Sequence, residues 1–355
     1  MRIGVPKETK TLEGRVALVP AAAGDLVKRG HEVWVEQDAG IKSGFKNTDY
    51  SALGVKIAPD AASLYEKGEL IVKVKEPIAG DLALLRKDHL LFCYLHLAAE
   101  PALTRKLLDI GLTGVAFETV ELPNGDLPLL APMSIIAGKI AVQIGTHLLH
   151  QPVGGKGKLL GGLPSTERGK VVVFGAGKAG GASAALAASS GANVTVFEMR
   201  TDRMDEMMQL GNNVTALYPY HDVVAREVAS ADLVVGAVLV TGAKAPHVLT
   251  RDMLKAMEPG SVLVDIAIDQ GGCFETSRPT NWQDPTYVEE GVTHFCVTNM
   301  PGAVPQTSSQ AICAAILPWV NKLASGNWRD SAPLVRGINI DGGKIVHPAL
   351  QGMKL

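Results

Sequence analysis

A glycine-rich segment with the sequence GAGKAG, residues 175–180, follows the apolar run 171–174 and precedes a run of small residues. In a strand–turn–helix unit each glycine has a mechanical task. Gly175 makes the tight turn, Gly177 lets the backbone approach a pyrophosphate, and Gly180 lets the helix pack closely on the strand. The helix N-terminus adds oriented N–H groups and a positive dipole. The pattern therefore predicts dinucleotide binding.

Glu198 stands where an acid would select among dinucleotides. The glycine pattern alone arises by chance in a chain with 38 glycines, so a turn without a ligand is the alternative interpretation. Glu198 ends the next predicted strand, 21 residues after Gly177 (198 − 177), where a carboxylate accepts hydrogen bonds from ribose hydroxyls. A carboxylate there repels a 2′-phosphate, which favours NAD over NADP. Arg200 and Arg203 follow closely and soften this preference without reversing it.

Four polar residues in unusual settings could do chemistry. Arg15 lies between a predicted strand and a helix, and Lys75 and His96 each close an apolar run. Asp269 closes another such run in the second half of the chain. Ligands of open α/β sheets gather at the carboxyl ends of strands, so Lys75 and His96 are placed to converge. Spacing alone favours surface cations, a core histidine and a capping Asp instead.

Short apolar runs alternate with segments of helical period in two series along the chain. The first series predicts strands at residues 2–5, 32–35, 70–74, 90–94 and 113–116. The second series predicts strands at residues 171–174, 193–197, 233–238, 261–268 and 293–298. Such alternation is typical of βαβ units and a largely parallel sheet.

Three helices are predicted from periodicity and flanking residues. The first, over 21–29, starts after a proline and ends at a glycine, and the second, over 135–149, lies between the two series. In the third, Thr307 or Ser308 would cap a helix over 309–324. This last helix is left over from both series, so we expect it to pack back on the first domain.

The length of 355 residues indicates two domains rather than one. We predict an α/β fold of two Rossmann-like domains with mostly parallel sheets, separated by an active-site cleft. Residues 1–130 plus 306–355 would form the substrate and catalytic domain. Residues 131–305 would form the NAD-binding Rossmann domain.

Composition excludes several classes of function. Lys plus Arg (34) nearly balances Asp plus Glu (36), and only 5% of residues are aromatic, so no nucleic-acid or anionic membrane partner is expected. No apolar run reaches the ~18 residues of a membrane span, and the N-terminus lacks a signal-peptide core. Four scattered cysteines predict buried free thiols and a cytoplasmic location. No clustered metal-ligand pattern is present, so no metal is expected.

Beyond these patterns, the sequence resembles the alanine dehydrogenases, a family that also includes the NAD-binding part of proton-translocating transhydrogenase. The resemblance runs nearly end to end and rests on strings that composition makes improbable. These strings are VPKET at 5–9, KVKEP at 73–77, LHLA at 95–98, LAPMS at 130–134, GAVLV at 236–240, VDIAIDQGGCFE at 264–275 and NMP at 299–301.

The resemblance implies a role for each candidate. Arg15 and Lys75 would hold a substrate carboxylate and polarise its oxo group, as a cationic clamp suits an oxo acid. His96 would be the general acid/base at the substrate oxygen. Asp269 would orient the attacking ammonia or the water that hydrolyses the imine. The implied NAD-binding residues are Ser134, Gly175, Gly177, Lys178, Ala179, Gly180, Glu198, Arg203, Leu239, Val240, Ile266, Ala267, Ile268, Asp269, Thr298, Asn299, Met300 and Pro301.

The implied activity is the NAD-dependent, reversible oxidative deamination of L-alanine to pyruvate and ammonia. The implied partners are these small molecules and further copies of the chain, since relatives form hexamers. Two departures from the family pattern stand near the adenosine. Glu198 replaces the usual Asp, and Pro219 and Tyr220 stand where many relatives have a small hydroxyl residue.

Three other functions stay open at this point. A soluble transhydrogenase component would have membrane partners and would not need the set Arg15, Lys75, His96 and Asp269. A related amino-acid or opine dehydrogenase would act on a bulkier substrate. A cofactor-binding regulatory module would need no acid/base residue.

Overall fold

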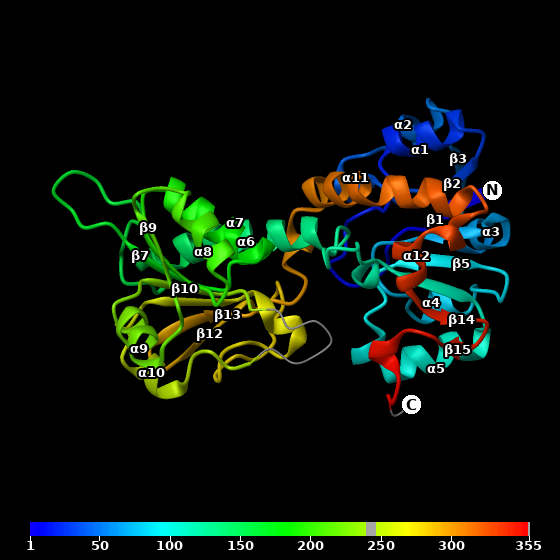
Figure 1. The fold of residues 1–355 in the computed structure, drawn as a ribbon. Helices are drawn as coiled ribbons and strands as arrows, with labels where there is room; N and C mark the ends of the chain where they lie inside the picture. Colours follow the sequence, from blue (N-terminus) through cyan, green and yellow to red (C-terminus); the bar gives the residue numbers. More distant parts are fainter. Residues whose placement is uncertain (239–245, 354–355) are drawn as a thin grey trace. The chain divides into compact units, whose positions relative to one another are not determined.

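The computed structural model describes residues 1–238 and 246–353, which divide into two compact units. Unit 1 comprises Met1–Met133 with Gly302–Leu355, and unit 2 comprises Ser134–Pro301. Each unit is built on its own β-sheet (Figure 1). The sequence predicted the domain boundaries at slightly different positions, after residue 130 and after residue 305. The assignment of one domain to the substrate and the other to NAD stays a prediction.

Unit 1 holds an eight-stranded sheet with the order β15-β14-β6-β5-β4-β1-β2-β3. Its strands are β1 (Arg2–Val5), β2 (Glu32–Glu36), β3 (Lys56–Ala58), β4 (Leu70–Val72), β5 (Leu90–Cys93), β6 (Thr113–Ala116), β14 (Ile338–Asp341) and β15 (Lys344–Ile345). Strands β1 to β6 are parallel, whereas β14 pairs antiparallel with β6 and with β15. The chain order reverses between β1 and β4, and ligands of open α/β sheets bind at such a switch point.

Helices flank this sheet. They are α1 (Pro20–Lys28), α2 (Asn47–Ser51), α3 (Ala61–Lys67), α4 (Ala79–Leu82), α5 (Pro101–Ile110), α11 (Pro305–Ala324) and α12 (Ala332–Arg336). The long helix α11 lies beside α1 (Figure 1). Ser309 Oγ of α11 accepts a hydrogen bond from the N–H of Val16 at 2.9 Å, and Cys313 Sγ accepts one from Val19 at 3.3 Å. The helix thus packs against the segment that leads from β1 into α1.

Unit 2 holds a seven-stranded sheet with the order β12-β13-β11-β10-β7-β8-β9. Its strands are β7 (Lys170–Phe174), β8 (Asn193–Phe197), β9 (Val214–Leu217), β10 (Leu233–Gly236), β11 (Val262–Asp265), β12 (Thr286–Glu289) and β13 (Val292–Phe295). Only β12 pairs antiparallel within the described residues. The helices are α6 (Ala131–Leu148), which starts in unit 1, α7 (Lys178–Ser189), α8 (Thr201–Met208), α9 (His221–Ala229) and α10 (Arg251–Lys255).

The predicted fold class, α/β with two mostly parallel sheets, is confirmed. Several strands end before the apolar runs that predicted them. The apolar run 70–74 forms a strand only as far as Val72. Val74 is buried in the loop that follows, and its backbone N–H donates a hydrogen bond to Glu8 at 2.7 Å. The run 261–268 gives a strand only to Asp265, after which a 3₁₀ helix, η5 (Ile266–Gln270), begins. Apolar residues indicate burial, and in both segments the chain stays buried beyond the last residue of the strand.

The predicted start of the last helix is wrong. The helix begins at Pro305 with Val304 as its N-cap, so neither Thr307 nor Ser308 caps it. Proline suits the first helical position, because its φ is preset and its missing N–H would be unpaired there. Ser308 is instead buried inside the first turns.

Each unit has an apolar core that packs against its sheet. In unit 2, Val172, Phe174, Val234 and Leu263 from neighbouring strands belong to one buried cluster. All four cysteines are buried and free, as predicted. Among the described residues, no helix combines the length and apolar character needed to cross a membrane.

Candidate active site

The glycine loop joins β7 to α7 in unit 2. Gly175 has φ +91°, a left-handed conformation that other residues rarely adopt. A Cβ on Gly180 would lie 1.8 Å from the carbonyl oxygen of Gly175, so close packing requires glycine there. A Cβ on Gly177 would meet no heavy atom within 4 Å, and its φ of −70° suits any residue. The protein itself gives no reason for Gly177, and the open space fits a pyrophosphate that approaches the backbone.

Glu198 follows β8, and its carboxylate is tied to this loop. Its Oε2 accepts a hydrogen bond from the N–H of Ala176 at 2.9 Å. Its Oε1 accepts from the N–H groups of Met199 at 2.8 Å and Arg200 at 3.1 Å. Arg203 Nη1 lies 3.9 Å from Oε2. A carboxylate offers about four lone-pair positions, so a ribose hydroxyl can still donate to Glu198.

Other predicted cofactor residues lie beyond the carboxyl ends of strands in the same sheet. Residues 266–269 follow β11 in η5, and residues 298–301 follow β13. Asn299 has a left-handed φ of +57°. Because β7, β8, β11 and β13 run parallel, these segments share one edge of the sheet with the glycine loop.

The remaining cofactor candidates are more scattered. Lys178 and Ala179 form the first turn of α7, and Ser134 lies in the first turns of α6. Leu239 and Val240 lie outside the described residues.

Two tyrosines follow β9, beside the end of β8. The rings of Tyr218 and Tyr220 lie 4.8 Å apart between centroids, and both side chains are exposed. The N–H of Glu198 donates to the carbonyl of Leu217 at 3.1 Å, which joins the two strand ends. Two exposed aromatic rings therefore lie beside the end of the strand that Glu198 follows.

Lys75 and His96 lie at one edge of the sheet of unit 1. Each is the third residue after its strand, β4 or β5, and these strands are parallel neighbours. The pairing continues past the strands, since the N–H of Tyr94 donates to the carbonyl of Val74 at 3.1 Å. Glu8 fixes the loop before Lys75, because its Oε1 accepts from the N–H groups of Val74 at 2.7 Å and Lys75 at 3.2 Å. The structure thus places Lys75 and His96 at the same edge of the sheet, and the convergence of their side chains stays a prediction.

The ammonium group of Lys75 faces its neighbour Glu76. Lys75 Nζ lies 3.5 Å from Glu76 Oε2, and Lys10 donates to Oε1 of the same carboxylate. Burial would raise the pKa of Glu76, but the charge of Lys75 and the hydrogen bond from Lys10 outweigh it and hold that pKa below its usual value. A negative carboxylate therefore orients the Lys75 cation.

Arg15 is buried, with 2% of its surface exposed. Its Nε and Nη2 donate to the two oxygens of Glu13 at 2.7 and 2.6 Å, and its Nη1 contacts the sulfur of Met133 at 3.2 Å. Burial opposes the charge, but the hydrogen bonds and charge of Glu13 outweigh it and raise the pKa of Arg15. Glu13 thus keeps the guanidinium charged and fixes its orientation.

His96 has a left-handed backbone with φ +50° and a half-exposed side chain. Glu118 holds it: Oε1 accepts from the N–H of His96 at 2.6 Å and of Leu95 at 3.1 Å. The imidazole stacks on the ring of Tyr94, with centroids 5.7 Å apart and planes 8° apart. An exposed imidazole on a fixed backbone can exchange protons with a bound molecule.

Asp269 is exposed in η5, in contrast to the buried Asp265 at the end of β11. The carboxylate of Asp265 accepts from the N–H groups of Ala267 and Cys273, both at 2.9 Å, and from Ser277 Oγ at 2.5 Å. Asp265 therefore shapes the turn, whereas Asp269 is available to a ligand.

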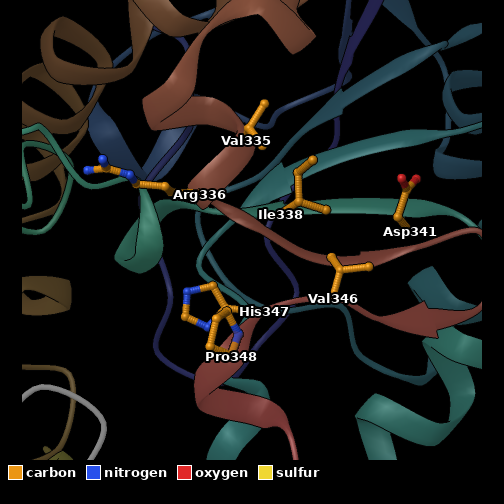
Figure 2. A pocket seen from close by; sticks show the side chains of 7 residues that line it. All are labelled: Val335, Arg336, Ile338, Asp341, Val346, His347 and Pro348. Atoms are coloured by element: carbon orange, nitrogen blue, oxygen red, sulfur yellow. The ribbon is translucent and has the colours of Figure 1, made fainter.

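A pocket of about 250 Å³ lies in unit 1 (Figure 2). It is lined by Val335, Arg336, Ile338, Asp341, Val346, His347 and Pro348. Its acid, Asp341, is held by Thr113 at 2.7 Å and Arg329 at 3.1 Å. A second cavity, beside Arg15, measures only about 10 Å³. That is room for one water, so an oxo acid bound by Arg15 would replace one of its present contacts.

Sequence reasoning missed three carboxylates: Glu8, Glu13 and Glu118. Each fixes a predicted site residue or its loop through hydrogen bonds. Glu8 lies inside the family string at 5–9, which was a usable signal. Glu13 and Glu118 lie outside the strings, and only the folded chain brings Glu118 to His96, 22 residues away.

The six parallel strands described in each sheet have the order 3-2-1-4-5-6 of dinucleotide-binding folds. One carries the glycine loop with an acid at the next strand end, and the other carries cations and an imidazole. These features define a two-domain α/β dehydrogenase that uses a nicotinamide cofactor.

Comparison with known proteins makes the family specific. Residues 4–137 match the alanine dehydrogenase/PNT N-terminal domain, and residues 141–348 match the C-terminal domain. The alanine dehydrogenase of Halomonas elongata is 48% identical and covers 99% of this chain and 96% of its own. The chain belongs to the alanine dehydrogenase/PNT family, which confirms the resemblance seen in the sequence.

Solved structures agree with this assignment. An L-alanine dehydrogenase superposes with a TM-score of 0.96 at 46% identity, covering 99% of this chain and 98% of that one. A transhydrogenase from Sinorhizobium meliloti superposes with a TM-score of 0.85 at 25% identity, covering 98% and 100%. The fold is thus common to both activities, and the side chains must distinguish them.

Proposed function

We propose that this chain is an NAD-dependent alanine dehydrogenase. In the balanced reaction, L-alanine, NAD⁺ and water give pyruvate, ammonium, NADH and a proton. The chain is 46–48% identical to alanine dehydrogenases over 99% of its length, which supports alanine as the substrate. The observation that carries the proposal is that Lys75 and His96 lie together at the carboxyl edge of two neighbouring parallel strands. A transhydrogenase, which passes hydride between nucleotides, would not need that pair.

The choice of NAD is supported by Glu198 and the glycine loop. Gly177 leaves space for the pyrophosphate, and Lys178–Gly180 supply the N-terminal turn of α7. Glu198 lies beside the loop with a charge that repels a 2′-phosphate. When bound, NAD supplies a hydride acceptor; all other steps fall to the chain.

Arg15 and Lys75 would bind the carboxylate and the oxo group of pyruvate. The Nη1 of Arg15 now contacts a thioether, a weak acceptor that a carboxylate would outcompete. Lys75 would polarise the oxo oxygen as a point charge. Since both cations have a carboxylate neighbour, Glu13 or Glu76, their positions are set before the substrate arrives.

His96 would donate a proton to the substrate oxygen during amination and accept it in the reverse direction. Asp269 would orient the ammonia that attacks pyruvate or the water that attacks the imine. Its carboxylate would also stabilise the iminium charge. We further place the reaction in the cytoplasm, in keeping with the free thiols, and in an assembly of identical chains.

The test is an assay of NADH oxidation with pyruvate plus ammonium. We expect turnover that requires both pyruvate and ammonium. The rate should fall when glyoxylate, 2-oxobutyrate or 2-oxoglutarate replaces pyruvate, or when NADPH replaces NADH. The control omits ammonium and should show no turnover. Absence of turnover with pyruvate and ammonium together would refute the proposed activity, and better turnover with a bulkier oxo acid would assign a related amino-acid dehydrogenase instead.

A further inference from the structure

Both carboxylate oxygens of Glu118 bind the backbone of Leu95 and His96, here called the His96 loop. Glu118 lies in the 3₁₀ helix η3 (Phe117–Thr119), directly after β6, and its side chain is only 16% exposed. Oε1 accepts from the N–H of His96 at 2.6 Å, and both oxygens accept from the N–H of Leu95, at 3.1 and 3.2 Å. Oε1 also lies 4.0 Å from Nδ1 of the His96 ring.

These contacts act on two properties of His96. Its left-handed backbone is uncommon for a residue with a side chain, and a short hydrogen bond from its N–H offsets that cost. The second property is the charge around the ring, since the Glu118 carboxylate lies 4.0 Å from Nδ1 and acts on it through space.

We propose that Glu118 is a positioning residue for His96, which fixes its backbone and biases its imidazole toward the charged form that donates a proton. This rests on the proposed function only in that His96 is taken as the acid/base group. Glu118 itself need not contact the substrate for this role.

Among the described residues, Glu118 is the acid within ion-pair distance of the His96 ring. Tyr94 stacks on the imidazole as an aromatic face. The 3₁₀ helix that follows His96, η2 (Leu97–Ala99), packs against α5, where Thr104 donates to Leu97, and against η8 (Pro348–Leu350). The N-cap of η8 is His347. Burial lowers the pKa of His347, and the charges of Glu118 and Glu121 oppose that shift.

The decisive variant is Glu118→Gln. Its amide oxygen can still accept from the N–H groups of both Leu95 and His96, since Oε1 now accepts from both, while the charge is lost. The matched control is Glu121→Gln, which removes the same charge from a residue with no hydrogen bond to the loop among the contacts described. Glu118→Ala removes charge and anchor together.

The first readout is an NMR titration of ¹³C-labelled histidine side chains, with the His96 signal identified by its loss in His96→Ala. In Glu118→Gln we expect the His96 midpoint to move roughly 0.7 pH unit toward acid, the fivefold effect of a unit charge 4 Å away across water. In Glu121→Gln it should stay within about 0.2 unit of the wild-type value. The second readout is the pH profile of turnover, whose limb assigned to His96 should move in the same direction.

An unmoved His96 midpoint in a folded Glu118→Gln protein would overturn the proposal. So would a loss of turnover in that variant without any displacement of the pH profile, because this outcome marks a purely structural anchor. Failure of the wild-type protein to oxidise NADH with pyruvate and ammonium would refute the proposed function alone, since the titration judges the Glu118–His96 relation without turnover.

Discussion

The carboxylate of Glu198 accepts a hydrogen bond at 2.9 Å from the backbone N–H of Ala176, so the acid after β8 is joined to the glycine loop after β7. A second bond ties the same strand ends, from the N–H of Gly175 to the carbonyl of Phe197 at 2.8 Å. The two sequence features that predicted a dinucleotide are thus one structural element. Glu198 therefore stabilises the glycine loop in addition to its proposed contact with the ribose.

Replacing Glu198 should change cofactor choice. In Glu198→Ser the charge that repels a 2′-phosphate is gone, and Arg203 is released from its carboxylate neighbour. We expect the ratio of kcat/KM for NADPH to that for NADH to rise at least about tenfold, equivalent to ~1.4 kcal/mol. The control is Asp202→Ser, since Asp202 pairs with Arg200. An unchanged ratio in Glu198→Ser would contradict the ribose assignment.

Two glycines of the loop should respond differently to alanine. Gly177→Ala adds a methyl group in open space, so the melting temperature should stay within about 2 °C, while the KM for NADH rises at least about tenfold. Gly180→Ala places the methyl group against the carbonyl of Gly175 and should lower the melting temperature by several degrees. Thermal unfolding and NADH titration measure both. Normal NADH affinity in Gly177→Ala would argue against a pyrophosphate at this point.

Two aspartates four positions apart, Asp265 and Asp269, should separate catalysis from folding. Asp269→Asn keeps the shape of an exposed side chain, so we expect a fall in kcat of about 100-fold at an unchanged melting temperature. Asp265→Asn instead turns an amide group toward buried N–H donors, which costs about 1–3 kcal/mol. It should lower the melting temperature. Near-normal kcat in Asp269→Asn would remove that residue from the mechanism.

Lys73 should matter for stability rather than chemistry. It is 1% exposed, and its Nζ lies 3.3 Å from Glu8 and 3.3 Å from Asp81. Burial alone would lower the pKa of Lys73, but the charges of the nearby carboxylates outweigh burial and raise that pKa above its usual value. Lys73→Met leaves two buried carboxylates without their cation, which costs about 3–5 kcal/mol. Thermal unfolding should show a drop of at least about 6 °C. The exposed control Lys87→Met should change little, and equal drops would contradict the buried network.

The sequence determined the parts of this protein that are local in the chain. Strands 2–5, 113–116 and 193–197 are found at the predicted bounds, because short apolar runs between turns have few alternatives in a parallel sheet. The glycine loop was equally readable, since its three glycines stand at a fixed spacing within six neighbouring residues. The family strings then supplied roles for Arg15, Lys75, His96 and Asp269 that spacing alone did not.

Only the tertiary structure decided what holds those residues. Glu118 reaches His96 because β5 and β6 are neighbours in the sheet, and strand order is not written in any local pattern. The end of β4 depends on a hydrogen bond from Val74 to Glu8, 66 residues away, so an apolar run overestimates the strand. Side-chain positions and strand ends result from long-range contacts. Apolar periodicity reports burial, which a loop and a strand can share.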